Sequence, residues 1–79
     1  MNFSVTPEPK AESVAFSSDA MTVHLCDGRS VSVPLEWFPS LRGASLEQLN
    51  MWRLIGGGIG IHWEPLDEDL SVRALLYPA

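Results

Sequence analysis

Two histidines and one cysteine are the side chains in this sequence best suited to metal binding or nucleophilic catalysis. His24 and Cys26 are two positions apart on a predicted strand, so they share one face, which His62 could join. A zinc site needs three or four ligands, and the sequence has neither a CxxC nor an HExxH motif. We therefore expect no metal, no cofactor and no catalytic residues. The alternative is a small ligand-binding or hydrolase domain that uses His24, Cys26 or His62.

Acidic residues and tryptophans are the other side chains that could carry a function, as parts of a surface that binds a partner. Four acids lie close together and indicate a rim that could meet an Arg or Lys: Glu64, Asp67, Glu68 and Asp69. Tryptophans are common both in cores and at the centres of interfaces. We expect Trp52 to be central in the core and Trp37, beside Phe38 and Pro39, to be partly exposed.

The glycine-rich run at 56–60 has the composition of a phosphate-binding loop but not its context. No Lys-Ser or Lys-Thr follows it, and the predicted order is helix, glycines, strand. A dinucleotide site needs strand, glycines, helix, because the phosphate binds at the helix N-terminus. We therefore interpret the run as the C-cap of a helix with close backbone packing.

Net charge and cysteine content restrict the classes of partner. Ten acids against five bases give a formal charge of −5 at pH 7 and a pI of about 4.7. Direct binding to nucleic acid or to anionic lipid needs a basic face, so we expect neither. A basic or mixed protein surface is the expected partner. A single cysteine, with no signal peptide and no apolar run of membrane-spanning length, favours the cytoplasm.

Alternation of apolar and polar residues predicts the first part of the fold. It indicates three consecutive antiparallel strands, at 13–17, 20–26 and 30–35. Asp27-Gly28 between the second and third strands is a strong hairpin signal, because glycine accepts a positive φ. Pro34 places the end of the third strand at a sheet edge or at its exit from the sheet, because proline cannot donate a ladder hydrogen bond.

The face of this sheet that points away from the core is predicted to carry small, mostly uncharged groups. They are Ser13, Ala15, Ser17, Thr22, His24 and Cys26. An open sheet face with few charges favours association. We therefore expect a homodimer or a partner complex through this face, with Trp37 and Phe38 at its border and the acids of 64–69 on the rim.

One main helix is expected after the strands. Ser45 and Gln48 match a capping box, in which the serine caps the helix start and the glutamine reaches back. Three apolar residues then recur at helical spacing: Leu49, Trp52 and Ile55. The pattern predicts a helix over 46–55 packed on one face of the sheet.

The remaining pattern completes an α+β prediction. Renewed alternation indicates a fourth strand at 59–63, and apolar residues at 70–76 indicate a short C-terminal helical turn. The predicted order is β-β-β-α-β, with a small antiparallel sheet in a single domain over 1–79. We expect residues 1–11 to be an extended N-terminal segment of that domain.

Four segments of the sequence occur in a characteristic order. They are Asp27-Gly28 with Val33-Pro34-Leu35; Trp37-Phe38-Pro39-x-Leu41; Ala44-Ser45-Leu46-Glu47-Gln48 with Trp52-Arg53-Leu54; and Gly58-Ile59-Gly60-Ile61-His62-Trp63-x-x-Leu66-Asp67-Glu68-Asp69-Leu70-Ser71-Val72. Together, over 12–77, they resemble the bacterial domain-of-unknown-function family number 2442. Ser40 and Leu46 depart from the family pattern, where a basic residue and a proline are common.

The resemblance implies a compact α+β domain with no established enzymatic activity. It also implies a setting beside a second small protein, in an arrangement like that of toxin and antitoxin. We therefore expect a non-catalytic interaction or regulatory domain, antitoxin-like, whose partner is a co-encoded small protein. A second alternative is an acidic nucleic-acid mimic that blocks a basic protein groove, as some phage inhibitors do.

Aromatic and polar residues of these segments, with their acidic neighbours, form the partner-binding surface that we predict. They are Trp37, Phe38, Arg53, His62, Trp63, Glu64, Asp67, Glu68 and Asp69. Alternatively, these residues have a purely structural role. In that interpretation Arg53 forms an ion pair with Asp67 or Asp69 that holds the glycine loop in place.

Overall fold

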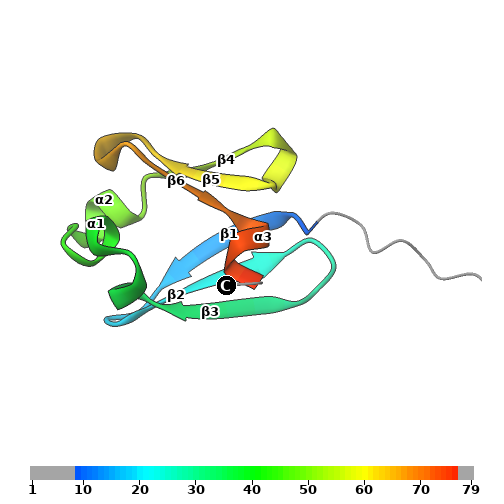
Figure 1. Cartoon of the computed structure of the whole chain (residues 1–79), viewed down its shortest axis with the longest axis horizontal. Coiled ribbons are helices and arrows are strands. Elements are labelled where there is room, and N and C mark those ends of the chain that lie inside the picture. Colours follow the sequence, from blue (N-terminus) through cyan, green and yellow to red (C-terminus); the bar gives the residue numbers. More distant parts are fainter. Residues whose placement is uncertain (1–8, 77–79) are drawn as a thin grey trace, which may run out of the picture.

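The chain forms two antiparallel sheets of three strands each around one core (Figure 1). The computed structural model describes residues 9–76, so most of the predicted extended segment at 1–11 lies outside the described residues. Sheet A contains β1 (Ala11–Phe16), β2 (Ala20–Leu25) and β3 (Ser30–Pro34). Sheet B contains β4 (Trp52–Ile55), β5 (Gly60–Trp63) and β6 (Glu68–Ser71).

Short helices connect and flank the sheets. The 3-10 turns are η1 (Leu35–Trp37), η2 (Gly56–Gly58) and η3 (Glu64–Leu66). The α-helices are α1 (Pro39–Arg42), α2 (Leu46–Leu49) and α3 (Val72–Leu76). None of these helices within residues 9–76 is long and apolar enough to cross a membrane.

Sheet A confirms the predicted meander of three strands. Along β2, the buried residues Met21, Val23 and Leu25 alternate with residues that face outward, as period-two alternation requires. The turn after β2 is the predicted hairpin, in which Gly28 has a φ of +96°. Asp27 accepts hydrogen bonds from the backbone amide and the side chain of Arg29 at 3.0 and 2.8 Å.

The predicted helix over 46–55 is wrong in its second half. Helix α2 begins at the predicted capping box but ends at Leu49, and the chain continues as β4 from Trp52. A short apolar run can satisfy both helical and strand periodicity, so spacing alone cannot separate the two. Strand pairing decided it: β4 satisfies its backbone groups against β5, whereas a helix of about ten residues gains little by itself.

The single sheet with one main helix is therefore replaced by two small sheets. The fourth strand predicted at 59–63 exists as β5, but it is the central strand of sheet B rather than an addition to sheet A. The segment predicted as a helical turn is divided between β6 and α3. The α+β class is confirmed, whereas the order β-β-β-α-β is not.

The glycine run joins β4 to β5 and is not the C-cap of a helix. Gly56, Gly57 and Gly58 all have positive φ, which the tight reversal between the strands requires. At Gly58 an added Cβ would lie 2.6 Å from the backbone oxygen of Ala11, so the turn packs directly on the start of β1. This close approach connects sheet B to sheet A at one end of the molecule.

The core lies between the inner faces of the two sheets, with one tryptophan at its centre. Trp63 has no exposed surface and meets the ring of Phe16 edge to face, with 6.4 Å between ring centroids. Its indole nitrogen donates a hydrogen bond of 2.9 Å to the carbonyl of Leu49. The expectation that Trp52 is central is wrong, because Trp52 is half-buried at the side of this core. Trp37 is 54% exposed, as predicted.

Candidate functional site

The register of sheet B brings a row of polar side chains together on its outer face. Arg53 of β4 is opposite His62 of β5, and His62 is opposite Asp69 of β6. The adjacent row contains Leu54, Ile61 and Leu70, which face the core, because successive residues of a strand alternate between the two faces. Glu64 follows directly after β5 and joins the polar row from one side. We call Arg53, His62, Glu64 and Asp69 the outer row of sheet B.

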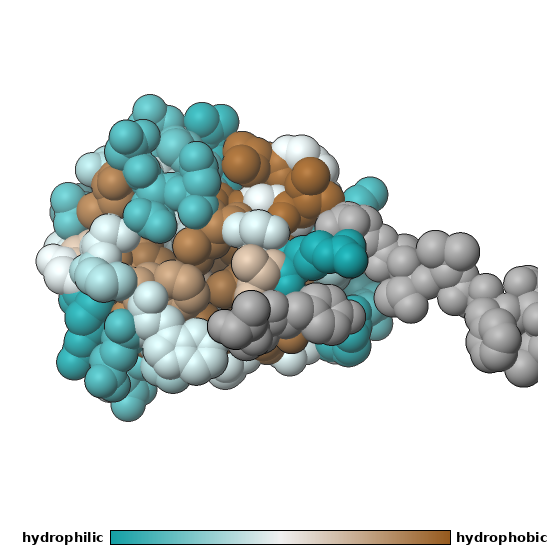
Figure 2. All heavy atoms as spheres, in the orientation of Figure 1, coloured by the Kyte–Doolittle hydropathy of each residue, from teal (hydrophilic) through white to brown (hydrophobic). Residues whose placement is uncertain are grey.

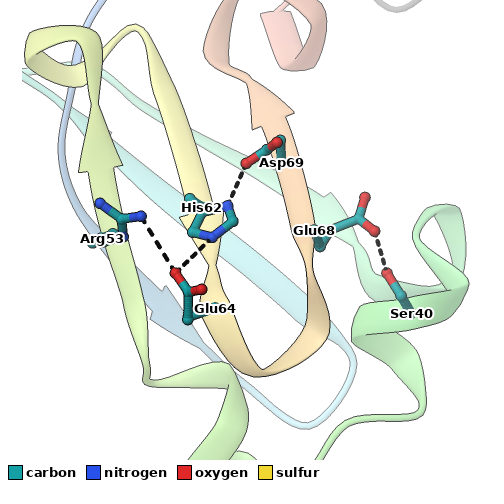
Figure 3. Close-up of polar contacts among 6 residues, drawn as sticks. All are labelled: Ser40, Arg53, His62, Glu64, Glu68 and Asp69. Carbon is teal, nitrogen blue, oxygen red and sulfur yellow. Dashed lines mark hydrogen bonds and ion pairs between the residues drawn. The ribbon is translucent and has the colours of Figure 1, made fainter.

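His62 is the centre of the outer row (Figure 3). Its Nδ1 hydrogen-bonds the Asp69 carboxylate, and its Nε2 lies 3.1 Å from Oε1 of Glu64. The same Glu64 oxygen accepts a hydrogen bond from Arg53 Nη2 at 3.3 Å. The side chain of His62 is only 13% exposed, whereas those of Arg53, Glu64 and Asp69 are 63–77% exposed. A largely covered imidazole therefore positions two carboxylates that face solvent.

This geometry favours the protonated form of His62. The hydrogen bond to Asp69 raises the pKa of His62 above its usual 6.5, and partial removal of water opposes the shift. The hydrogen bond to Glu64 and the negative charges of both carboxylates raise the pKa further. A protonated imidazole donates from both ring nitrogens, which matches its two carboxylate partners.

The outer row is better suited to presenting charge than to acid–base or metal chemistry. Both nitrogens of His62 are occupied by carboxylates, so neither is free to accept a proton from a substrate. Over residues 9–76 no cluster of three or more His, Cys, Asp or Glu side chains could hold a metal ion. What remains is an ordered set of two carboxylates and one guanidinium, all exposed to a partner, around the largely covered His62.

The structure divides the other residues that were predicted for partner binding. Asp67 is exposed in the turn before β6, where its φ is +50°, and it forms no part of the outer row. Glu68 is half-buried and accepts a hydrogen bond of 2.7 Å from Ser40 Oγ of α1. Trp63 is buried, so it belongs to the core and not to a binding surface. The ion pair expected from Arg53 to Asp67 or Asp69 is wrong, because Arg53 pairs with Glu64.

The aromatic pair predicted at the border of a binding surface lies away from the outer row. Trp37 ends η1, which follows sheet A, and its side chain is exposed. Phe38 is the next residue and packs partly against the core. These two residues extend the surface of the sheet A end of the molecule.

The residues of the alternative catalytic site are not brought together. His24 and Cys26 belong to sheet A and the turn after it, whereas His62 belongs to sheet B. His24 Nδ1 is 2.9 Å from Ser30 Oγ, and the exposed Cys26 thiol points to the carbonyl of Ala11 at 3.7 Å. Neither contact resembles the pairing of a nucleophile with a base.

Two features of the site were missed by sequence reasoning. Ser40, which fixes Glu68, is 28 positions away in the sequence and carries no local signal for the contact. An apolar hollow at the glycine end of sheet B was also missed, although three residues that border it, Ile55, Ile59 and Gly60, lie close together in the sequence.

Comparison with known proteins identifies the family of the chain. No curated protein matches the sequence significantly. A crystal structure of a protein of unknown function from Rhodospirillum rubrum is similar, with 36% identity and a TM-score of 0.77 over 89% of this chain and 87% of that one. A solution structure of an uncharacterized protein from Chromobacterium violaceum is also similar, with 28% identity and a TM-score of 0.73. That match covers 85% of this chain and 63% of the other. The family model "Protein of unknown function (DUF2442)" matches residues 11–79, and the chain therefore belongs to this family.

Proposed function

We propose that this chain is a non-catalytic protein-interaction domain that acts as the antitoxin-like partner of a co-encoded small protein. The observation that carries the proposal is the outer row of sheet B. Its carboxylates are exposed to solvent, yet a covered histidine and an arginine hold them in place. Pre-ordered side chains lose less conformational freedom on binding, so such a row favours recognition of a partner surface.

The distribution of polar groups supports interaction rather than catalysis. In the described part of the chain every buried residue of the core is apolar, and the polar residues lie on the surface. Enzyme sites instead place titratable groups in a pocket where burial and neighbours tune them. The outer row lies on an open sheet face, where a partner of similar size can reach all of its members.

The outer face of sheet A is the second surface of the proposed interaction domain. The register aligns residues without acidic, lysine or arginine side chains in two rows: Ser13, His24 and Ser30; and Ala15, Thr22 and Ser32. Thr22 and Ser32 hydrogen-bond each other at 2.8 Å across the strands. We propose that this face supports the homodimer or adds to the partner contact, with Trp37 and Phe38 at its border.

Two further features bear on the setting and on the alternatives. The one cysteine is free and exposed, which is consistent with the reducing cytoplasm that we propose as the location. A nucleic-acid mimic needs an unbroken row of carboxylates. Here Glu64 and Asp69 are paired with Arg53 and His62, so the charge pattern favours a mixed protein surface over a basic nucleic-acid groove.

The proposal is tested by co-expressing the chain with the product of the adjacent gene. We expect a complex that survives size-exclusion chromatography and has a defined stoichiometry. Reversal of one charge in the outer row, Asp69→Arg, should abolish the complex, because it places two cations beside His62. The matched control is Asp67→Arg, which makes the same charge change at an exposed residue outside the row.

Two results would contradict the proposal. One is the absence of a complex together with a turnover activity that depends on His24, Cys26 or His62. The other is a complex that neither Asp69→Arg nor Thr22→Lys weakens, because these variants alter the outer faces of both sheets. Measuring the reactivity of the Cys26 thiol against pH is a simple first test that distinguishes an interaction domain from an enzyme. A thiol that is already deprotonated and reactive at low pH would favour an enzyme.

A further inference from the structure

An apolar hollow of about 490 Å³ opens at the glycine end of sheet B. It lies beside the outer row and shares one residue, Asp69, with it. The end of β4, the turn after it, the start of β5 and strand β6 line it, through Ile55, Gly56, Ile59, Gly60, Asp69, Leu70 and Ser71. Figure 2 shows apolar atoms gathered over this end of the sheet, next to hydrophilic atoms.

The side chain of Ile55 covers the position in the central strand that has no side chain, Gly60. Gly60 is opposite Ile55 in β4 and Ser71 in β6, so the three residues form the next row on the outer face. An added Cβ at Gly60 would lie 2.9 Å from Ile55 Cγ1 and 3.4 Å from the carbonyl oxygen of Leu70. Ile59 borders the hollow and is 42% exposed. Gly60 itself is buried, so isoleucine side chains form the floor and one wall of the hollow.

A carboxylate with spare hydrogen-bonding capacity forms the opposite wall. Oδ1 of Asp69 is bonded to His62, whereas Oδ2 has no partner among the described residues. The Asp69 side chain is 68% exposed. This carboxylate pairs with His62 and not with Arg53, which reaches Glu64 on the other side of His62. A carboxylate oxygen in this state can accept a hydrogen bond from a group that enters the hollow.

We propose that this hollow binds a Lys or Arg side chain from a basic segment of the protein partner. The methylene stem of that side chain would lie on Ile55 and Ile59. Its cationic head would reach Oδ2 of Asp69, which also lines the hollow. The formal charge of −5 makes a basic segment the complementary one. The source of the side chain rests on the proposed function, whereas the chemistry of the hollow does not.

The test is a titration of ¹⁵N-labelled protein with short peptides followed by NMR. The probe is acetyl-Leu-Arg-Leu-amide, and acetyl-Leu-Gln-Leu-amide is the neutral control of similar shape. We expect saturable shift changes centred on the amides of Gly60, Asp69 and Ser71 with the arginine peptide. Asp69→Asn should weaken binding about fivefold, which corresponds to the loss of one exposed ion pair.

Matched variants separate the hollow from general charge attraction. Asp67→Asn removes an exposed acid outside the hollow and should leave binding unchanged. Ile59→Ser should weaken binding, whereas Leu46→Ser, at another exposed apolar residue, should not. The proposal is wrong if Asp69→Asn and Asp67→Asn bind equally well, or if the glutamine peptide binds as tightly as the arginine peptide. It is also wrong if butylguanidinium binds more tightly than the peptide, which would indicate a free small cation as the ligand.

Failure of this proposal and failure of the proposed function give different results. In one case, the adjacent gene product forms a complex that Asp69→Asn leaves intact, and the peptide shifts no amide of the hollow. The hollow is then not the contact, whereas the proposed role as an interaction domain is retained. In the other case, the peptide binds at the hollow but no complex forms with the adjacent gene product. The hollow then binds a cationic side chain, but that protein is not its source.

Discussion

The outer faces of the two sheets differ in the kind of side chain that they present to solvent. On sheet A, cross-strand partners such as Thr22 and Ser32, or His24 and Ser30, join through hydrogen bonds of 2.8 and 2.9 Å that involve no carboxylate, ammonium or guanidinium group. On sheet B, the equivalent partners are Arg53, His62 and Asp69, which are held by ion pairs. Both sheets are three-stranded and antiparallel, so topology does not account for the difference.

The comparison separates two roles that a small sheet can have. A neutral face with small residues can be covered by another protein at low desolvation cost, because no charge has to leave water. A charged face contributes selectivity and association rate instead, since it repels surfaces of the wrong sign. We therefore expect changes on sheet B to affect partner choice, and changes on sheet A to affect self-association.

Removal of the central tryptophan is expected to reduce the stability of the protein more than any other change proposed here. Trp63→Ala would empty a fully buried site of sheet B and leave the carbonyl of Leu49 without its hydrogen bond. We expect a loss of about 3–5 kcal/mol in the free energy of unfolding, measured by urea denaturation. Trp37→Ala is the control: because Trp37 is 54% exposed, we expect a change within about 0.5 kcal/mol. Equal losses in the two variants would contradict the central position of Trp63 in the core.

The contact between the glycine turn of sheet B and the first strand of sheet A has the next largest expected effect. In Gly58→Ala the new Cβ would meet the backbone oxygen of Ala11 at 2.6 Å while φ stays at +108°. Because backbone cannot move aside cheaply, we expect a loss of about 2 kcal/mol or more. Gly57→Ala, where the added Cβ meets no atom within 4 Å, should cost about 1 kcal/mol through its positive φ alone. Thermal unfolding of the two variants measures the difference, and a larger loss for Gly57→Ala would be inconsistent with close packing at Gly58.

The ion pairs of sheet B should make its stability depend on pH. Because the pKa of His62 is raised by folding, the protonated imidazole stabilises the folded state fully below its usual value of 6.5. That contribution disappears as the pH rises through the raised pKa. We therefore expect Asp69→Asn to lose more stability relative to the native chain near pH 5.5 than near pH 9. Urea denaturation at both pH values measures the loss, and NMR titration of the His62 ring should show a lowered pKa in the variant.

The matched control for this pH effect is Asp67→Asn, because Asp67 has no contact with His62 in the described structure. A loss of stability that is the same at both pH values, or that grows with pH, would show that Asp69 does not act through His62.

A charge on sheet A has the smallest expected effect on folding. Thr22→Lys places an ammonium group on an outer face where the long side chain can reach solvent, so the stability should change by less than about 0.5 kcal/mol. Self-association should weaken, because the charge would have to leave water when a second copy covers the face. Sedimentation velocity at high concentration measures this. If the native chain is a monomer at high concentration, the outer face of sheet A is not a dimer surface. The difference between the side chains of the two outer faces then has no role in self-association.

The first half of the fold could be predicted because its signals are local. The alternation of buried and exposed residues along β2, the hairpin at Gly28 and the capping box at Ser45 each depend on residues a few positions apart. The periodicity of apolar residues indicates which face of a strand is buried, and the residue types in a turn indicate where φ is positive. Family membership was also readable, because its motifs are runs of sequence that need no contact information.

The second half of the fold could be predicted only in part, because it depends on contacts between residues that are distant in the sequence. Nothing near Trp52 distinguishes a helix from a strand, and its pairing with Trp63 across sheet B made the choice. The same register selected Glu64 as the partner of Arg53 and brought Asp69 to His62. A shift of one residue in the strand pairing would move each of these side chains to the other face. The composition of the candidate site was therefore visible in the sequence, whereas its pairing, its exposed carboxylates and the hollow at Gly60 were set by strand register in the folded protein.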